Sequence, residues 1–271
     1  MKKAFSLVEL AIVLVVIGLL SATIVGGQKL VEQMKTKKVI SEVKTIQSAL
    51  TTFNTMYDAF PGDMADATSY WTSGTDNGDG DKAIEVTADS SGTGSSETGR
   101  AFQHLSLAGL VDGSYTVGNV LETTPALAYD SKISKNAVYI LTSFCLIKDT
   151  VLTDNNHCGG NTDSVIRLGS AQSVEDHTDS YVGYGILTIE QASSIDSKID
   201  DGKPRRGFIY SHNEYTVVSV SDDTREKAGC LRFETSLGAT ALTSTDVDLA
   251  FYNYGEDFKC NMSFDIDILN L

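Results

Sequence analysis

The sequence has little positive charge, few prolines and no recognisable catalytic motif. Of its 271 residues, 21 are Lys or Arg and 36 are Asp or Glu, which gives a formal net charge of −15. A nucleic-acid surface needs clustered basic side chains to neutralise phosphates, so we expect no dedicated surface of that kind. Apolar residues make up 41% of the chain, which is enough for a globular core and excludes an intrinsically disordered protein.

The short motifs that mark common active sites are missing as well. The sequence has no G-x-S-x-G turn, no glycine-rich phosphate loop and no H-E-x-x-H helix. Its histidines lie in unrelated segments: His104, His157, His177 and His212. We therefore expect no enzyme activity, although a site assembled from distant residues would escape a motif search.

The N-terminus carries a long apolar stretch. Residues 10–28 contain no charged side chain, and this length is about enough to span a bilayer as a helix. Lys2 and Lys3 precede the stretch, and such lysines favour keeping the start of the chain in the cytoplasm. An ordinary cleaved secretory signal fits less well, because Leu20 occupies a position that normally carries a small residue. We expect one membrane span, with the rest of the chain extracytoplasmic.

A helical pattern continues beyond the apolar stretch. Between residues 28 and 59 no proline or glycine interrupts the chain, and Pro61 then disfavours further helix. We predict one helix over residues 5–59, with a membrane half (5–28) and an amphipathic stalk (29–59). The apolar face has a spacing of three and four residues: Val39, Val43, Ile46, Leu50, Phe53 and Tyr57. The polar positions are interpreted as solvated: Lys35, Lys37, Lys38, Glu42 and Lys44. The alternative is that this basic patch contacts lipid headgroups or the acidic head of a neighbouring subunit.

Residues 1–9 combine a short basic leader, the small residue Ala4, then Phe5, and Glu9 at the head of the apolar stretch. This combination resembles the processing signal of type IV pilins and type II secretion pseudopilins. The resemblance implies that a prepilin peptidase removes residues 1–4 and methylates the new N-terminus at Phe5. It also implies that the helix packs into a filament with other subunits, assembled by a platform in the bacterial inner membrane.

Glu9 is a costly residue at this position, because a carboxylate entering hydrocarbon costs a few kcal/mol. Cleavage before Phe5 would free an amine a little over one helical turn away, and that charge would pair with Glu9 in the same or the next subunit. A pair of this kind sets register better than it adds stability. The alternative is a solvated Glu9 at headgroup depth; the family resemblance favours the register role.

Residues 60–271 are expected to form an extracytoplasmic head, which makes the whole chain an α+β protein. Helices are predicted at 100–109 and at 188–200, the second with a capping box between Thr188 and Gln191. Strands are predicted at 138–147, 185–187, 207–220, 230–234 and 247–254. Three segments resemble recurring segments of large-headed members of the family: YDAFPGDMADATSYW, RAFQHLSLAGLVDGSY and IDSKIDDGKPRRG.

Calcium, in the loop TDNGDGDK, is the one candidate cofactor that the sequence offers. Its candidate ligands are Asp76, Asn77, Asp79 and Asp81. Oxygen ligands between glycines suit calcium, but an EF-hand match fails because its first and last ligands would be Thr75 and Val86. A solvated acidic turn is the alternative. A second, weaker candidate is the cluster Asp196, Asp200 and Asp201.

Four cysteines lie in the C-terminal half: Cys145, Cys158, Cys230 and Cys260. In an oxidising compartment they allow three disulfide connectivities, of which we expect the sequential one, Cys145–Cys158 and Cys230–Cys260. The second bridge would tie the last strands together, as a C-terminal disulfide does in many pilins. Zinc is disfavoured because no C-x-x-C pair exists.

The sequence thus predicts a structural subunit of a type IV pilus or a type II secretion pseudopilus. The head of about 200 residues is large for a major pilin, which favours a minor subunit. The expected location is the inner membrane and then a periplasmic or surface filament. The alternative is a membrane-anchored extracytoplasmic binding domain or enzyme that does not polymerise.

Overall fold

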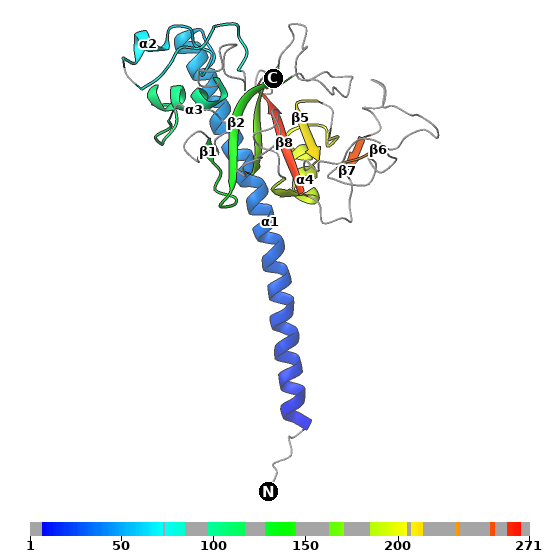
Figure 1. The fold of residues 1–271 in the computed structure, drawn as a ribbon. Coiled ribbons are helices and arrows are strands. Elements are labelled where there is room, and N and C mark those ends of the chain that lie inside the picture. The colour runs from blue at the N-terminus through cyan, green and yellow to red at the C-terminus, as the bar shows by residue number, and fades with distance from the viewer. Residues whose placement is uncertain are drawn as a thin grey trace, which may run out of the picture.

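The computed structural model describes residues 7–72, 74–84, 97–116, 128–144, 163–170, 185–204, 207–213, 231–233, 250–252 and 259–266. Figure 1 shows α1 as one rod that runs from the N-terminal end into a head gathered around its second half. The elements are α1 Leu7–Tyr57, α2 Ala67–Tyr70, α3 Glu97–Leu107, β1 Tyr129–Asp130, β2 Ala137–Phe144, β3 Asp163–Ser170, β4 Leu187–Thr188, α4 Ile189–Ile199, β5 Ile209–Asn213, β6 Leu231–Phe233, β7 Ala250–Tyr252 and β8 Lys259–Asp265.

The long helix α1 is 51 residues long, which corresponds to roughly 75 Å. It ends where the sequence predicts. The amide of Asp58 donates to the carbonyl of Asn54 at 2.8 Å, and Asp58 then takes a left-handed conformation with φ of 51°. Pro61 follows three residues later, and the chain leaves the helix axis.

One face of the second half of α1 is part of the head's core. Five of the six predicted face residues are buried: Val39, Val43, Ile46, Leu50 and Phe53. The sixth, Tyr57, is partly buried at the end of the helix. Burying a side chain of this size stabilises by roughly 1.5–3 kcal/mol, so the head depends on α1 for one wall of its core.

The head is built on a six-stranded sheet in the order β1-β2-β3-β8-β4, with β5 also paired to β8. Every pairing is antiparallel. Because β3 and β5 both pair with Met262 and Phe264, they lie on opposite sides of β8. The face of the sheet in the main core is lined by Tyr139, Leu141, Ile166, Leu168, Met262 and Phe264. The predicted α+β class, a long helix on an antiparallel sheet, is confirmed.

Two central strands were missed by the sequence prediction, β3 and β8. In β8 the residues Lys259–Asp265 include Asn, Ser, Asp and Cys, which have little preference for strands when considered alone. Pairing on both sides of β8 overrides that preference. In β3 the buried Arg167 interrupts the short apolar run from Val165 to Leu168. Strand character in both segments comes from tertiary contacts that their composition does not reveal.

Local signals placed α4 accurately. The helix spans Ile189–Ile199, and its capping box is present: the Gln191 amide donates to Thr188 Oγ1 at 3.3 Å. The Thr188 amide in return donates to Gln191 Oε1 at 3.0 Å. Helix α3 begins three residues earlier than predicted, at Glu97, and Gly109 follows its end with φ of 71°. Both helices carry the apolar faces that pack on α1 and the sheet.

Candidate functional site

The first half of α1 is apolar and exposed along its length. Leu7, Leu14 and Ile24 have 86%, 62% and 60% of their surface exposed. None of the described side chains in this apolar stretch is buried. Among the described residues this is the one helix long and apolar enough to cross a membrane, by length and composition. A single-pass anchor and a signal sequence both fit that description.

Glu9 lies in the first turn of this exposed helix. A carboxylate near a helix N-terminus interacts favourably with the helix dipole. The processing residues Ala4 and Phe5 lie outside the described residues. The register role of Glu9, cleavage after Ala4 and methylation at Phe5 therefore stay predictions.

Glu42 is not a solvated stalk residue, and that part of the sequence interpretation is wrong. Its side chain is 4% exposed and accepts three hydrogen bonds from the head. The donors are Ser131 Oγ at 2.6 Å, the Lys132 amide at 3.0 Å and the Tyr139 hydroxyl at 3.1 Å. Burial and the Glu42 charge raise the pKa of Tyr139 well above its usual value. Glu42 therefore fastens α1 to the sheet and to the turn before it.

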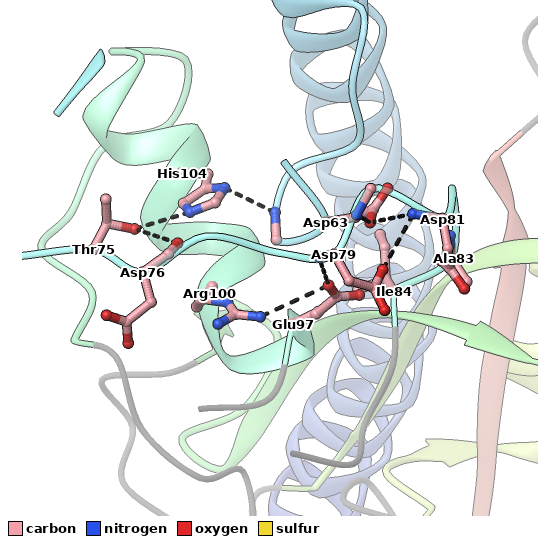
Figure 2. Close-up of polar contacts among 12 residues, drawn as sticks. Asp63, Thr75, Asp76, Asp79, Asp81, Ala83, Ile84, Glu97, Arg100 and His104 are labelled. Atoms are coloured by element: carbon pink, nitrogen blue, oxygen red, sulfur yellow. Dashed lines mark hydrogen bonds and ion pairs between the residues drawn. The ribbon is translucent and has the colours of Figure 1, made fainter. Parts of the chain in front are cut away.

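Asp63 is the centre of a second polar cluster, above the end of α1. Its Oδ1 accepts from the amides of Gly80 and Asp81 at 2.7 and 3.1 Å, and its Oδ2 accepts from Lys82 at 3.0 Å. Figure 2 shows Asp63 facing this loop. Burial raises the pKa of Asp63 to about 6, against the lowering effect of the Gly80 and Lys82 amides. Asp63 thus closes the loop of residues 76–82 with main-chain hydrogen bonds.

The four predicted calcium ligands do not come together as one group. The Asn77 side-chain oxygen accepts from the Thr68 amide at 2.9 Å. Asp79 and Asp81 accept from amides two residues further on, those of Asp81 and Ala83. The carboxylates whose oxygens lie within 4.8 Å of one another in this region are Asp63, Asp79 and Glu97. Of the predicted set this group contains Asp79 alone, and calcium binding stays a prediction.

His104 is a packed histidine. It is fully buried on α3, where Nδ1 accepts from the Gly62 amide at 3.0 Å and Nε2 lies 2.9 Å from Thr75 Oγ1. An accepting Nδ1 requires the neutral ring with its proton on Nε2. Burial, with a contribution from Arg100, lowers the pKa of His104 to about 4. The ring bridges two loop segments to α3 (Figure 2).

The second acidic cluster caps the end of α4. Asp196 is fully buried and accepts from the Gly202 amide at 3.2 Å. Asp200 accepts from the amides of Phe208 and Ile209, and Asp201 from that of Lys203. The three carboxylates have oxygens within 4.8 Å of one another, as predicted from sequence. Main-chain amides therefore donate hydrogen bonds to the three carboxylates that the sequence offered as ligands for a cation.

Of the four cysteines in the predicted disulfides, the structure describes Cys260 alone. Cys260 is fully buried in β8 and is not a free thiol. Cys145, Cys158 and Cys230 lie outside the described residues, so the sequential pairing stays a prediction. His157 and His177 also lie outside the described residues. His212 lies in β5 and His104 in α3, so these two histidines belong to different elements.

Sequence reasoning missed Glu42 and Asp63 as anchoring residues. For Glu42 a signal was available: it is three residues after Val39 and four before Ile46, and that spacing places it on the buried face of the helix. Asp63 had no comparable signal, because its partners are 17 to 19 residues away in a loop.

The architecture is pilin-like, with an apolar N-terminal helix whose second half packs on an antiparallel sheet. Comparison with family models, curated proteins and solved structures finds no match.

Proposed function

We propose that this chain is a structural subunit, of the minor type, of a type IV pilus or a type II secretion pseudopilus. In this proposal it is held in the bacterial inner membrane by α1, with its head extracytoplasmic. A prepilin peptidase cuts after Ala4 and methylates Phe5. The assembly platform then transfers the subunit into a periplasmic or surface filament. The role is structural and involves no catalysis.

The proposal rests on one observation: α1 is a single uninterrupted helix whose two halves have different surroundings. One face of the second half is buried in the head, while the described side chains of the first half are mostly apolar and exposed. A membrane covers such a surface, and so do the equivalent helices of neighbouring subunits. One helix therefore serves both environments, and the three segments that resemble large-headed family members support the same assignment.

The proposal is tested by Glu9→Ala in the full chain, expressed in cells that assemble the filament. We expect normal cleavage after Ala4 and a loss of filament incorporation of tenfold or more, on the order of the effect of stranding one partner of a buried charge pair. Cleavage is read by N-terminal sequencing, and incorporation by immunoblot of sheared or purified filaments.

The matched control is Glu32→Ala, which removes an exposed carboxylate from the same helix beyond the apolar stretch. It should leave cleavage and incorporation unchanged. If Glu9→Ala subunits are cleaved and incorporated like the wild type, the register role is wrong. A wild-type chain that is never found in filaments would favour the alternative, a membrane-anchored binding domain or enzyme.

A further inference from the structure

The end of the head farthest from the membrane half of α1 carries a group of aromatic rings. Tyr57 at the end of α1 meets Tyr70 and Trp71 at the end of α2, with ring centroids 5.2 and 5.5 Å apart. Tyr70 has 55% of its surface exposed, and Tyr57 and Trp71 are half-buried. Figure 1 places α2 beside the C-terminal end of α1, at the far end of the rod.

Two buried rings pack against Trp71. Phe53 and His104 have ring centroids 6.3 and 5.5 Å from that of Trp71, and both are buried. Two exposed carboxylates lie close to the rings in sequence: Asp58 directly follows Tyr57, and Asp66 is the N-cap of α2, four residues before Tyr70. We term Tyr57, Asp58, Asp66, Tyr70 and Trp71 the distal aromatic surface. A rigid, partly exposed aromatic patch is typical of an interaction surface.

The charge of this region selects the partner. Residues 54–84 contain one basic residue, Lys82, and six acidic ones: Asp58, Asp63, Asp66, Asp76, Asp79 and Asp81. Cations are attracted both by carboxylates and by the faces of Tyr and Trp rings. The rings touch one another, so a cation would lie over their exposed faces rather than between them. The distal aromatic surface therefore fits a lysine- or arginine-bearing partner.

The chain itself offers such a partner. Residues 29–44 carry five lysines against two glutamates, of which Glu42 is buried by the head. Lys35, Lys37 and Lys44 are exposed, and we term them the lysine neck. Lys37 and Lys44 border an open groove of about 630 Å³ on α1. Ile40 and Ser41 line the groove between them, and its volume leaves room for a ring such as that of Tyr70.

The two surfaces cannot meet within one molecule. Both lie on the continuous helix α1 or next to its end, and Lys44 precedes Tyr57 by 13 residues, or about 20 Å of helix. A cation–π contact reaches about 6 Å. We propose that the distal aromatic surface of one copy docks on the lysine neck of the next copy. A head-to-tail contact of this kind extends into a filament where the rotation between successive copies does not close a ring.

This inference rests on the proposed function and is tested on the full chain in the membrane where it assembles. Labelled and unlabelled copies are mixed, and carboxylates are joined to contacting lysines with a zero-length carbodiimide. We expect links between copies, from Asp58 or Asp66 to Lys37 or Lys44, identified by mass spectrometry. Asp66 makes no side-chain cap to α2, so Asp66→Lys should leave the fold intact.

Charge reversal provides the decisive comparison. Asp66→Lys and Lys44→Glu should each lower the yield of these links about tenfold, and the double variant should restore it, because opposite charges again face each other. Tyr70→Ala should also lower the yield. Glu190→Lys reverses an exposed charge on α4 and should leave the yield unchanged.

Four results would overturn the inference. If filaments form but neither single reversal changes the links, the docking is wrong while the proposed function stands. The same holds if Asp66 becomes linked to a different protein and not to the lysine neck. If the wild-type chain enters filaments but shows no contact between copies, the docking is wrong while the proposed function stands. If it never enters filaments, both the docking and the proposed function fail.

Discussion

Glu42 joins the helix to the head at one buried point. Replacing it with Ala leaves three donors without their acceptor, two of them on the buried residues Ser131 and Tyr139. We expect Glu42→Ala to lower the free energy of unfolding by about 2–4 kcal/mol. Glu42→Gln keeps one acceptor oxygen and should cost less. Urea unfolding, followed by the fluorescence of the single Trp71, measures both in detergent.

Glu32→Ala is the control for this experiment, because Glu32 is exposed on the same helix. Its effect should stay within about 0.5 kcal/mol. Equal losses for Glu32→Ala and Glu42→Ala would contradict the anchoring role.

His104 and Asp63 give the head opposite responses to acid. The pKa of His104 is lowered to about 4, so between pH 6.5 and 4 the unfolded state binds more protons and stability falls as the pH falls. The pKa of Asp63 is raised to about 6, so between pH 6 and 4 the folded state binds more protons and stability rises as the pH falls.

Single variants separate the two responses. With Asp63→Asn, stability should fall by about 2–3 kcal/mol from pH 6.5 to 4, since His104 then acts without opposition. With His104→Gln, stability should rise over the same acid range. Denaturant unfolding at half-unit pH steps measures both slopes. Slopes of the same sign in the two variants would be inconsistent with these assignments.

At the scale of elements, α4 tests whether local capping controls a helix within the head. Thr188→Ala removes the acceptor for the Gln191 amide and should lower the free energy of unfolding by about 1 kcal/mol. Thr188→Ser keeps the hydroxyl and serves as the matched control. The measurement is urea unfolding together with hydrogen exchange at the Gln191 amide. Unchanged exchange in Thr188→Ala would show that packing alone holds the helix.

Local chemistry decided which elements the sequence could predict. Capping at Thr188, the stop at Pro61 and the spacing of Val39 to Phe53 act within a few residues, so α1 and α4 were predicted closely. The strands β3 and β8 depend on partners far away in sequence, and Arg167 and Cys260 gave no strand signal. The candidate site followed the same rule: the exposed apolar helix was predictable, while Asp63 and its loop partners were not.

For the whole molecule, the topology in the membrane can be measured directly. We expect a cysteine placed at Asp81, in the exposed loop of the head, to react with a membrane-impermeant maleimide added from the periplasmic side. In the uncleaved chain, in cells that lack the prepilin peptidase, a cysteine at Lys3 should react after the inner membrane is opened, because lysines hold that end in the cytoplasm. The reverse pattern would contradict the proposed orientation.

The uninterrupted course of α1 also has a mechanical consequence. A force applied to the N-terminal end of α1 reaches the head through the helix itself and not through a flexible linker. It acts in shear along the buried face from Val39 to Phe53 and on the Glu42 hydrogen bonds. The force is therefore shared by many contacts at once, and we expect the head to stay attached to α1 until its core unfolds.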